Sequence, residues 1–334
     1  MKVGIVGVGF MGTTHASGWA DTPAQIAGFT AETQDEAEKL AMQYQAKVYS
    51  SLDAMLPDVD VVDICSPTHL HHEMILKAAA AGKHIVCEKP LARTTQQARE
   101  VVEACSKAGV QLLVAHVVRF FPEYALAQSA IANGQIGKPA VLRLHRGSYR
   151  PKKPAGNWFL EESKSGGILM DLMIHDYDYA RWIAGDVETV SARRVTESHS
   201  DAPVDYGLVI LGHKSGALSH IAGSWAYPPP TFITRFEIAG EHGLIEFDSE
   251  ATAPIHNLIL KTGGSDAPDV GLPSSPVSES PYTTQLKEFY AALADGKPTR
   301  VRATDGLASV QIAEAALQSA RTNQPVTLQS LAEA

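Results

Sequence analysis

The feature that most constrains the fold is a glycine pattern near the start of the chain. Residues 7–12 read Gly-Val-Gly-Phe-Met-Gly, directly after the apolar run Val3–Val6 and before a stretch that predicts a helix from Thr13. In a strand–turn–helix unit the first glycine permits the tight turn, the second lets backbone approach a pyrophosphate, and the third lets the helix pack closely on the strand. The phosphates then lie at the helix N-terminus. The pattern therefore predicts a dinucleotide site at this turn, formed by Gly7, Gly9, Phe10, Met11 and Gly12.

Up to about residue 118, short apolar runs alternate with amphipathic segments. The runs lack polar alternation, which is typical of parallel strands buried on both faces of a sheet. Strand and helix in alternation indicate the α/β class. Residues 1–118 are thus predicted to form an NAD(P)-binding Rossmann domain with a doubly wound parallel sheet. The predicted strands are Val3–Val6, Ile26–Phe29, Val61–Cys65, Ile85–Cys87 and Leu112–Ala115, and the predicted helices are Thr33–Tyr44, His71–Ala81 and Thr95–Ala108.

After Phe120 the pattern changes to consecutive strands with hairpin turns. Residues 119–334 are predicted to form an α+β domain with a mostly antiparallel, open sheet. Thr262–Pro281, rich in Gly, Ser and Pro, predicts a surface loop. The predicted strands are Ala140–His145, Leu208–Leu211, Ala217–Gly223, Phe232–Ala239 and Leu244–Phe247, and the predicted helices are Gly167–Ile183, Tyr282–Ala294 and Thr304–Thr322.

Composition and charge exclude several classes of protein. The formal net charge of −9 argues against nucleic acid or an anionic membrane as the main partner, since both require a basic surface. Three cysteines without a CxxC pair indicate neither a disulfide framework nor a cysteine zinc site, and a reducing cytoplasm is expected. No stretch is long and apolar enough to span a bilayer. The group His69, His71 and His72 has no convincing further ligand, so no metal is predicted.

The choice between NAD and NADP depends on the residues that end the second predicted strand. An acidic residue about twenty positions past the glycine turn holds the ribose 2′-hydroxyl of NAD. The second predicted strand ends in Thr30-Ala31-Glu32, with Ala31 where an aspartate is expected and no arginine to receive a 2′-phosphate. Glu32 repels such a phosphate, whereas Thr30 and Ala31 leave room for one. The cofactor is predicted to be NAD or NADP, with NAD slightly favoured.

Four further motifs resemble the glucose–fructose oxidoreductase / inositol dehydrogenase (Gfo/Idh/MocA) family. Cys87-Glu88-Lys89-Pro90 closes a predicted strand, and Ser66-Pro67-Thr68-His69-Leu70-His71 is similar to the family's strand-end loop beneath the nicotinamide. Arg119–Pro122 is similar to its entry into the second domain, and Gly166–Asp176 to its catalytic helix. The motifs occur in family order, and from about residue 185 only the general pattern matches.

The resemblance implies hydride transfer between NAD(P) and a secondary alcohol or ketone of a sugar or cyclic polyol. It implies a second domain whose open sheet often serves oligomerisation, hence a homo-dimer or homo-tetramer. Ala31 departs from the family pattern, as does Met173, where a small residue is usual. The implied catalytic residues are Lys89, Asp171 and His175, which are also assigned to substrate contacts. Cofactor contacts beyond the glycine turn are assigned to Ala31, Glu32, Ser66, Pro67, Thr68, His71, Glu88 and Lys89. From the residues themselves, Arg119 and Trp158 are further candidates for substrate contacts or for the domain junction.

The residues themselves allow this chemistry. Oxidation of an alcohol needs a base for the hydroxyl proton, and Lys89 lies at the carboxyl end of a strand, where doubly wound sheets bind ligands. Asp171, His175 and Asp178 have the spacing of one helical face. A turn lysine, a capping acid and a buried histidine are the structural alternatives for Lys89, Asp171 and His175, and Asp178 is assigned a structural role.

Two other functions stay open. One is a reductase of a non-carbohydrate carbonyl or imine, with Lys89 or Tyr149 as proton donor. The other is a non-catalytic sensor or regulator that binds the dinucleotide and relays it to a protein partner. The joint presence of Lys89, Asp171 and His175 favours an enzyme, because a binding protein needs the glycine turn but no proton relay.

Overall fold

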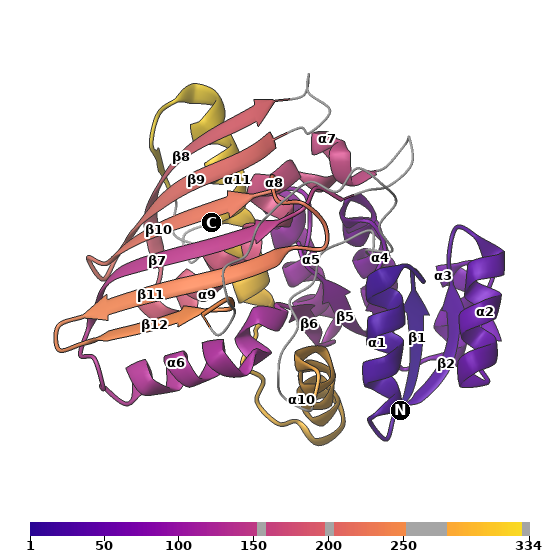
Figure 1. Ribbon diagram of the computed structural model, residues 1–334. Helices are drawn as coiled ribbons and strands as arrows, with labels where there is room; N and C mark the ends of the chain where they lie inside the picture. Colours follow the sequence, from indigo (N-terminus) through magenta and orange to yellow (C-terminus); the bar gives the residue numbers. More distant parts are fainter. Residues whose placement is uncertain (152–157, 198–203, 252–278, 329–334) are drawn as a thin grey trace. The chain divides into compact units, whose positions relative to one another are not determined.

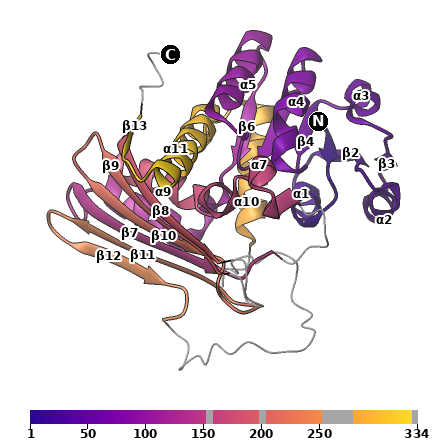
Figure 2. The same ribbon diagram turned by 90° about the horizontal axis from the view of Figure 1, so that it is seen from above.

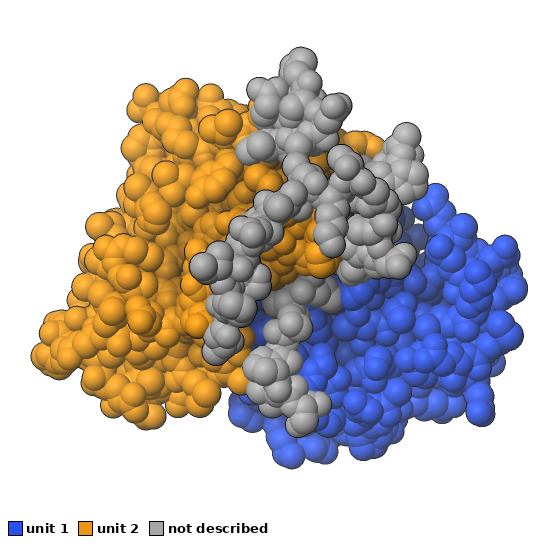
Figure 3. Space-filling view, in the orientation of Figure 1, with its two compact units in different colours: residues 1–121, 275–310 blue, residues 122–274, 311–334 orange. Residues whose placement is uncertain are grey.

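The computed structural model describes residues 1–151, 158–197, 204–251 and 279–328. The chain divides into two compact units, which Figure 3 shows in different colours. The first unit holds Met1–Phe121 and Ser275–Val310, and the second holds Pro122–Ser274 and Gln311–Ala334. The predicted division into domains at residues 118 and 119 stays a prediction. Of the predicted loop Thr262–Pro281, residues 262–278 lie outside the described residues.

The first unit is built on a six-stranded sheet in the order β3-β2-β1-β4-β5-β6 (Figure 1). Every neighbouring pair in this sheet is parallel. The strand order reverses between β1 and β4, and ligands of doubly wound sheets bind at the carboxyl ends beside that point. The predicted Rossmann fold is confirmed. The strands are β1 (Lys2–Val6), β2 (Gln25–Thr30), β3 (Lys47–Val48), β4 (Val61–Ile64), β5 (His84–Glu88) and β6 (Leu112–Ala115).

Helices cover this sheet and are bounded by local capping signals. Thr94 accepts a hydrogen bond from the Gln97 N–H at 3.2 Å, and Gly109 ends the same helix with a φ of 67°. The first helix begins at Phe10 rather than at Thr13, because Gly9 already serves as its N-cap. The helices are α1 (Phe10–Ala20), α2 (Gln34–Tyr44), α3 (Leu52–Met55), α4 (Thr68–Ala80), α5 (Thr95–Ala108) and α10 (Pro281–Asp295), with the 3-10 turns η1 (Leu56–Asp58) and η2 (Val117–Phe120).

The second unit contains a seven-stranded sheet in the order β12-β11-β7-β10-β9-β8-β13. The β7–β10 pair is parallel and the other pairs are antiparallel, which confirms the predicted architecture. The longest strand, β8, was not predicted, because polar and charged residues interrupt its apolar pattern. The strands are β7 (Pro139–Ser148), β8 (Val187–Glu197), β9 (Val204–His213), β10 (Leu218–Ser224), β11 (Phe232–Gly240), β12 (Leu244–Asp248) and β13 (Val326–Thr327).

The single helix predicted over Gly167–Ile183 is instead two helices, α8 and α9, separated at Leu172 and Met173. A Cβ added at Gly207 or Gly223 would lie 2.6 or 2.4 Å from an atom of the Met173 side chain. These two glycines face each other on β9 and β10. They leave the room that Met173 fills at the break. The helices of this part of the chain are α6 (Pro122–Ala132), α7 (Glu162–Ser165), α8 (Gly167–Asp171), α9 (Ile174–Ala184) and α11 (Ala303–Thr322), with the 3-10 turn η3 (Trp158–Leu160).

One face of the second sheet is open. Helices α8 and α9 pack on β7, β9 and β10, and Figure 2 shows α9 on one side of the sheet. No described helix or strand of this unit covers the other side, where Val195, Tyr206, Ile210 and Leu218 are 63%, 38%, 44% and 52% exposed. Within the described residues, no helix has both the length and the apolar character that crossing a bilayer requires.

Candidate cofactor site and active site

The glycine turn after β1 meets three different steric requirements. Gly7 has a φ of +92°, and a Cβ there would lie 2.7 Å from the carbonyl oxygen of Cys65. A Cβ on Gly12 would lie 1.9 Å from the carbonyl oxygen of Gly7, so helix and turn touch without room for a side chain. A Cβ on Gly9 would meet no atom within 4 Å. The turn is therefore closed at Gly7 and Gly12 and open at Gly9.

Helix α1 begins at this open position. Gly9 is its N-cap, and the first turn contains no acidic side chain. The first N–H groups of a helix have no partner within the helix, and the helix dipole places partial positive charge there. Phe10, Met11 and Gly12 thus present donors beside free space, which fits the pyrophosphate of a dinucleotide.

The end of β2 is tied to the same turn. The Gly7 N–H donates to the carbonyl oxygen of Thr30 at 2.8 Å, and Thr30 itself is buried. Ala31 is half-buried and Glu32 is exposed immediately after it. The predicted ribose-selecting residues therefore directly follow a residue whose backbone is bonded to the glycine turn.

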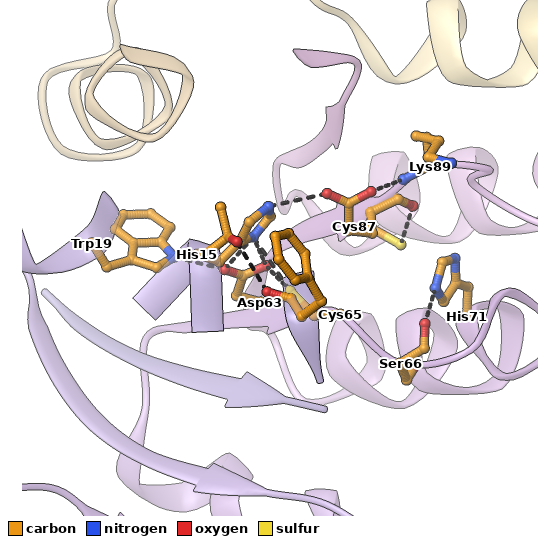
Figure 4. Close-up of polar contacts among 11 residues, drawn as sticks. His15, Trp19, Asp63, Cys65, Ser66, His71, Cys87 and Lys89 are labelled. Atoms are coloured by element: carbon orange, nitrogen blue, oxygen red, sulfur yellow. Dashed lines mark hydrogen bonds and ion pairs between the residues drawn. The ribbon is translucent and has the colours of Figure 1, made fainter. Parts of the chain in front are cut away.

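His71 links the loops that follow β4 and β5. Its ring is buried in α4, with Nδ1 2.8 Å from the Pro90 carbonyl oxygen. Its Nε2 lies 2.8 Å from the Ser66 carbonyl oxygen (Figure 4). Burial lowers the pKa of His71, although both carbonyl contacts act in the opposite direction. His71, a predicted cofactor residue, therefore lies between the Ser66 and Pro90 carbonyl oxygens, and as a neutral ring it donates to one of the two.

Lys89 follows β5 and is half-buried. The preceding Glu88 is buried and folds back, so that its Oε2 accepts a hydrogen bond from the Lys89 N–H at 3.0 Å. Its other oxygen, Oε1, lies 3.1 Å from His15 Nε2. Burial raises the pKa of Glu88, but His15 and Lys89 more than offset burial and leave that pKa lowered. Glu88 is therefore a buried carboxylate that fixes the backbone of Lys89.

His15 is the centre of a buried polar group that the sequence did not predict. We call it the His15 cluster: His15 and Trp19 from α1, Asp63 from β4 and Glu88 from β5. His15 Nδ1 lies 2.9 Å from Asp63 Oδ2, and Trp19 donates to the same oxygen at 2.7 Å (Figure 4). With Glu88 at its other nitrogen, the ring faces a carboxylate on both sides, and only a protonated imidazole donates from both nitrogens.

The protonation of His15 follows from these neighbours. Burial lowers the pKa of His15, but the charge of Asp63, aided by Cys65, outweighs burial and raises that pKa well above its ordinary value. Two features of the sequence could have indicated the cluster. Asp63 interrupts an otherwise apolar buried strand, and His15 and Trp19 have the i, i+4 spacing of one helical face.

The thiol of Cys65 lies beside the cluster, with Sγ 3.3 Å from His15 Nδ1. His15, Asp63 and Cys65 place their ligand atoms within 4.8 Å of one another. Burial raises the pKa of Cys65 to about 12, so the thiol stays protonated, and a protonated imidazole has no lone pair to offer a metal. We assign no metal to these residues, and the absence of a metal site stays a prediction.

The raised pKa of His15 makes stability depend on pH. Protonated His15 stabilises the folded protein. This contribution is fully present below the unfolded-state pKa of about 6.5 and is lost as the pH rises toward the folded-state pKa. We expect the free energy of unfolding to fall as the pH rises above about 7, by up to about 1.4 kcal/mol per pH unit from this one proton, until the folded-state pKa is reached. Urea unfolding of wild type and His15→Asn measures it, and equal slopes in both proteins would contradict the expectation.

In the second unit, Asp171 ends α8 and His175 lies in the first turn of α9. Asp171 is buried and His175 is half-buried. The next residue, Asp176, accepts two hydrogen bonds from Arg146 of β7, at 2.8 and 2.9 Å, and both side chains are 2% exposed. This buried pair, which the sequence did not predict, anchors the first turn of α9 to the sheet. Asp178 is buried one turn further along.

Two predicted substrate residues have contacts of their own. Arg119 is buried in the first unit and donates to the Arg300 carbonyl oxygen at 2.6 Å and to Asp305 at 3.3 Å. Trp158 stacks on Phe159 with ring centroids 3.9 Å apart. Arg119 thereby joins η2 to the start of α11. A substrate role for either residue stays a prediction, and so does the meeting of Lys89 with Asp171 and His175, which belong to different units.

A doubly wound sheet with an open glycine turn is typical of dinucleotide-binding proteins, and the lysine at the end of β5 lies at the edge of the sheet where such folds bind ligands. Comparison with known families agrees. A profile described as an oxidoreductase family with an NAD-binding Rossmann fold matches residues 1–116, and one for the C-terminal alpha/beta domain of that family matches residues 128–328. The chain belongs to this family, Gfo/Idh/MocA, and the resemblance seen in the sequence is confirmed.

Individual relatives match over nearly the whole chain. A myo-inositol 2-dehydrogenase of Thermotoga maritima is 31% identical over 347 aligned positions, covering 99% of both chains. The structure of GenD2 from gentamicin A biosynthesis, in complex with NAD, has a TM-score of 0.86 at 26% identity and covers 99% of this chain and 97% of its own. Levoglucosan dehydrogenase with NADH and levoglucosan has a TM-score of 0.83 at 25% identity, covering 99% and 100%.

Proposed function

We propose that this protein transfers a hydride between NAD(H) and a secondary alcohol or ketone of a sugar or cyclic polyol. The observation that carries the proposal is Lys89, fixed by Glu88 at the carboxyl end of β5, in the same sheet as the open glycine turn. Relatives named for inositol and levoglucosan support a substrate with several hydroxyl groups.

The residues of the chain handle the proton. When bound, the nicotinamide ring accepts or supplies the hydride. Oxidation of the alcohol releases a hydroxyl proton, so a positioned base is needed. We assign acid–base roles to Lys89 and His175 and assign Asp171 to binding a substrate hydroxyl group. The Arg146–Asp176 pair holds the first turn of α9 and so limits the positions open to His175.

We propose NAD rather than NADP as the preferred cofactor. Glu32 is exposed two residues after the end of β2, where its charge repels a 2′-phosphate. Thr30 and Ala31 beside it supply no positive charge that would bind such a phosphate. Solved relatives that carry NAD or NADH support this preference.

The proposed function is tested with a panel of cyclic polyols, sugars and sugar acids, each offered with NAD and with NADP. Reduced-nicotinamide absorbance gives the rate. We expect turnover on at least one polyol or sugar, with NAD as the better cofactor. Turnover confined to non-carbohydrate carbonyls or imines would favour the reductase. Tight NADH binding in calorimetry without turnover on any compound would favour the sensor.

We also propose a cytoplasmic homo-oligomer that buries the open face of the second sheet. An apolar area is left in water by a single chain at Val195, Tyr206, Ile210 and Leu218. A single-chain mass in light scattering would contradict the oligomer.

The cytoplasmic location is supported by the cysteines. All three are free thiols, which fits a reducing compartment.

A further inference from the structure

A line of hydrogen bonds joins helix α1 to the backbone of Lys89. His15 lies three residues after Gly12, so the helix that begins at the glycine turn also carries the imidazole. His15 Nε2 contacts Glu88 Oε1 at 3.1 Å, and Glu88 Oε2 accepts from the Lys89 N–H at 3.0 Å (Figure 4). The two oxygens of Glu88 thus have different partners, and rotation of the carboxylate disturbs both contacts.

We propose that His15 is a positioning residue for Lys89, acting through Glu88. The charged ring between Asp63 and Glu88 fixes the Glu88 carboxylate, and that carboxylate fixes the backbone from which the Lys89 side chain extends. The inference rests on the proposed function, because it assumes that Lys89 touches the reacting groups. It also couples the cofactor helix α1 to the end of β5.

Charge and burial explain why Glu88 depends on His15. Glu88 is 6% exposed, and a buried carboxylate is costly unless it is paired and hydrogen-bonded. Without the imidazole, Glu88 loses its positive partner and its bond to α1, while Asp63 stays nearby as a second negative charge. The carboxylate must then rotate or take up a proton, and either change loosens its hold on the Lys89 N–H.

Trp19 supplies a matched control. It lies on the same helix, is 0% exposed, and donates to Asp63 Oδ2 at 2.7 Å, without a contact to Glu88 in the hydrogen bonds of the described residues. Trp19→Phe removes a hydrogen bond from the His15 cluster and keeps the His15–Glu88 contact. If the cluster served stability alone, His15 and Trp19 variants would both lower the midpoint of unfolding and leave turnover unchanged in the folded protein.

The experiment compares His15→Asn, His15→Gln and Trp19→Phe with wild type on the best substrate of the panel, well below their unfolding temperatures. We expect the His15 variants to lose about 10- to 100-fold in kcat, as expected for a displaced reacting group. The KM for substrate and the Kd for NADH should change far less, and Trp19→Phe should keep the wild-type kcat. His15→Gln is included because it keeps a hydrogen-bond donor if His15→Asn fails to fold.

A double-mutant cycle locates the path. If His15 acts through Glu88, the kcat of His15→Asn combined with Glu88→Gln should be no lower than that of the more severe single variant. Full multiplication of the two losses would overturn the proposal, because it would mean that the residues act independently.

The protonation state of His15 provides a second measurement, which does not depend on enzyme turnover. In the cofactor-free protein labelled with ¹⁵N-histidine, the His15 signal is assigned by its absence in His15→Asn. We expect both ring nitrogens to carry protons at pH 8, where an ordinary histidine of pKa about 6.5 is neutral. A neutral His15 at that pH would overturn the proposal.

The outcomes separate the two levels of inference. Low turnover in Lys89→Ala with normal turnover in the His15 variants would reject the positioning role and leave the proposed function standing. Normal turnover in Lys89→Ala would reject the proposed role of Lys89 and the positioning role with it. Equal losses of kcat in the His15 variants and in Trp19→Phe would indicate a general packing effect and would also reject the proposal.

Discussion

Lys89→Ala should lower kcat by about 10²–10⁴, the usual span for the loss of a general acid–base group. The change removes the amine and leaves the peptide N–H that binds Glu88, so the end of β5 keeps its 3.0 Å backbone contact. NADH affinity should therefore change much less than turnover. Steady-state kinetics on the best substrate, together with NADH binding by calorimetry, measures both quantities.

Lys83→Ala is the matched control for this experiment. Lys83 is a half-buried lysine directly before β5, at the amino end of the strand that Lys89 follows. Its replacement removes the same charge from the same strand at the opposite edge of the sheet, and wild-type turnover is expected. Near-normal turnover in Lys89→Ala would contradict the acid–base role and would indicate that Lys89 is a structural residue of the turn.

The first unit was largely predictable because its signals are local. The glycine turn is a short pattern with one steric reason for each glycine, and α5 carries its own cap residues, Thr94 and Gly109. Buried parallel strands read as apolar runs, so β1, β2, β4, β5 and β6 were found. The two-residue β3 was missed, because so short a strand has no pattern to recognise.

The second unit shows what local patterns omit. Strand β8 combines charged residues with buried Val187, Val190 and Ala192. Which of its side chains face the core depends on its antiparallel pairing with β9. At the break between α8 and α9, the Met173 side chain fills the room left by two glycines on strands β9 and β10, Gly207 and Gly223. No helical periodicity within Gly167–Ile183 contains that information.

The candidate site divides in the same way. Lys89 was predicted because its motif is contiguous in the sequence and follows a strand. The His15 cluster was missed because it joins residues separated by 48 and 73 positions, on three different elements. Arg146 and Asp176, 30 positions apart, also become partners only when β7 and α9 pack together. Pairs of buried polar residues depend on the tertiary fold, and they are the part of the candidate site that the sequence predicted least well.

Gly9→Asp should weaken NADH binding by at least about 100-fold, because a like charge placed against a phosphate costs several kcal/mol. The added side chain enters the space that the pyrophosphate needs, and its carboxylate repels the phosphates. The fold should be unharmed. Gly9 has a φ of −68° and a ψ of −165°, which aspartate adopts freely, and a Cβ there meets no atom within 4 Å.

Aspartate is also a favoured N-cap, so the free energy of unfolding should stay equal or rise by roughly a few tenths of a kcal/mol. Gly12→Ala provides the contrast, because its Cβ would lie 1.9 Å from the Gly7 carbonyl oxygen and should cost stability as well as binding. Calorimetry with NADH and urea unfolding of both variants measures the two effects separately. Unchanged NADH affinity in a folded Gly9→Asp protein would contradict the placement of the pyrophosphate at the N-terminus of α1, since ligand and carboxylate cannot occupy that space together.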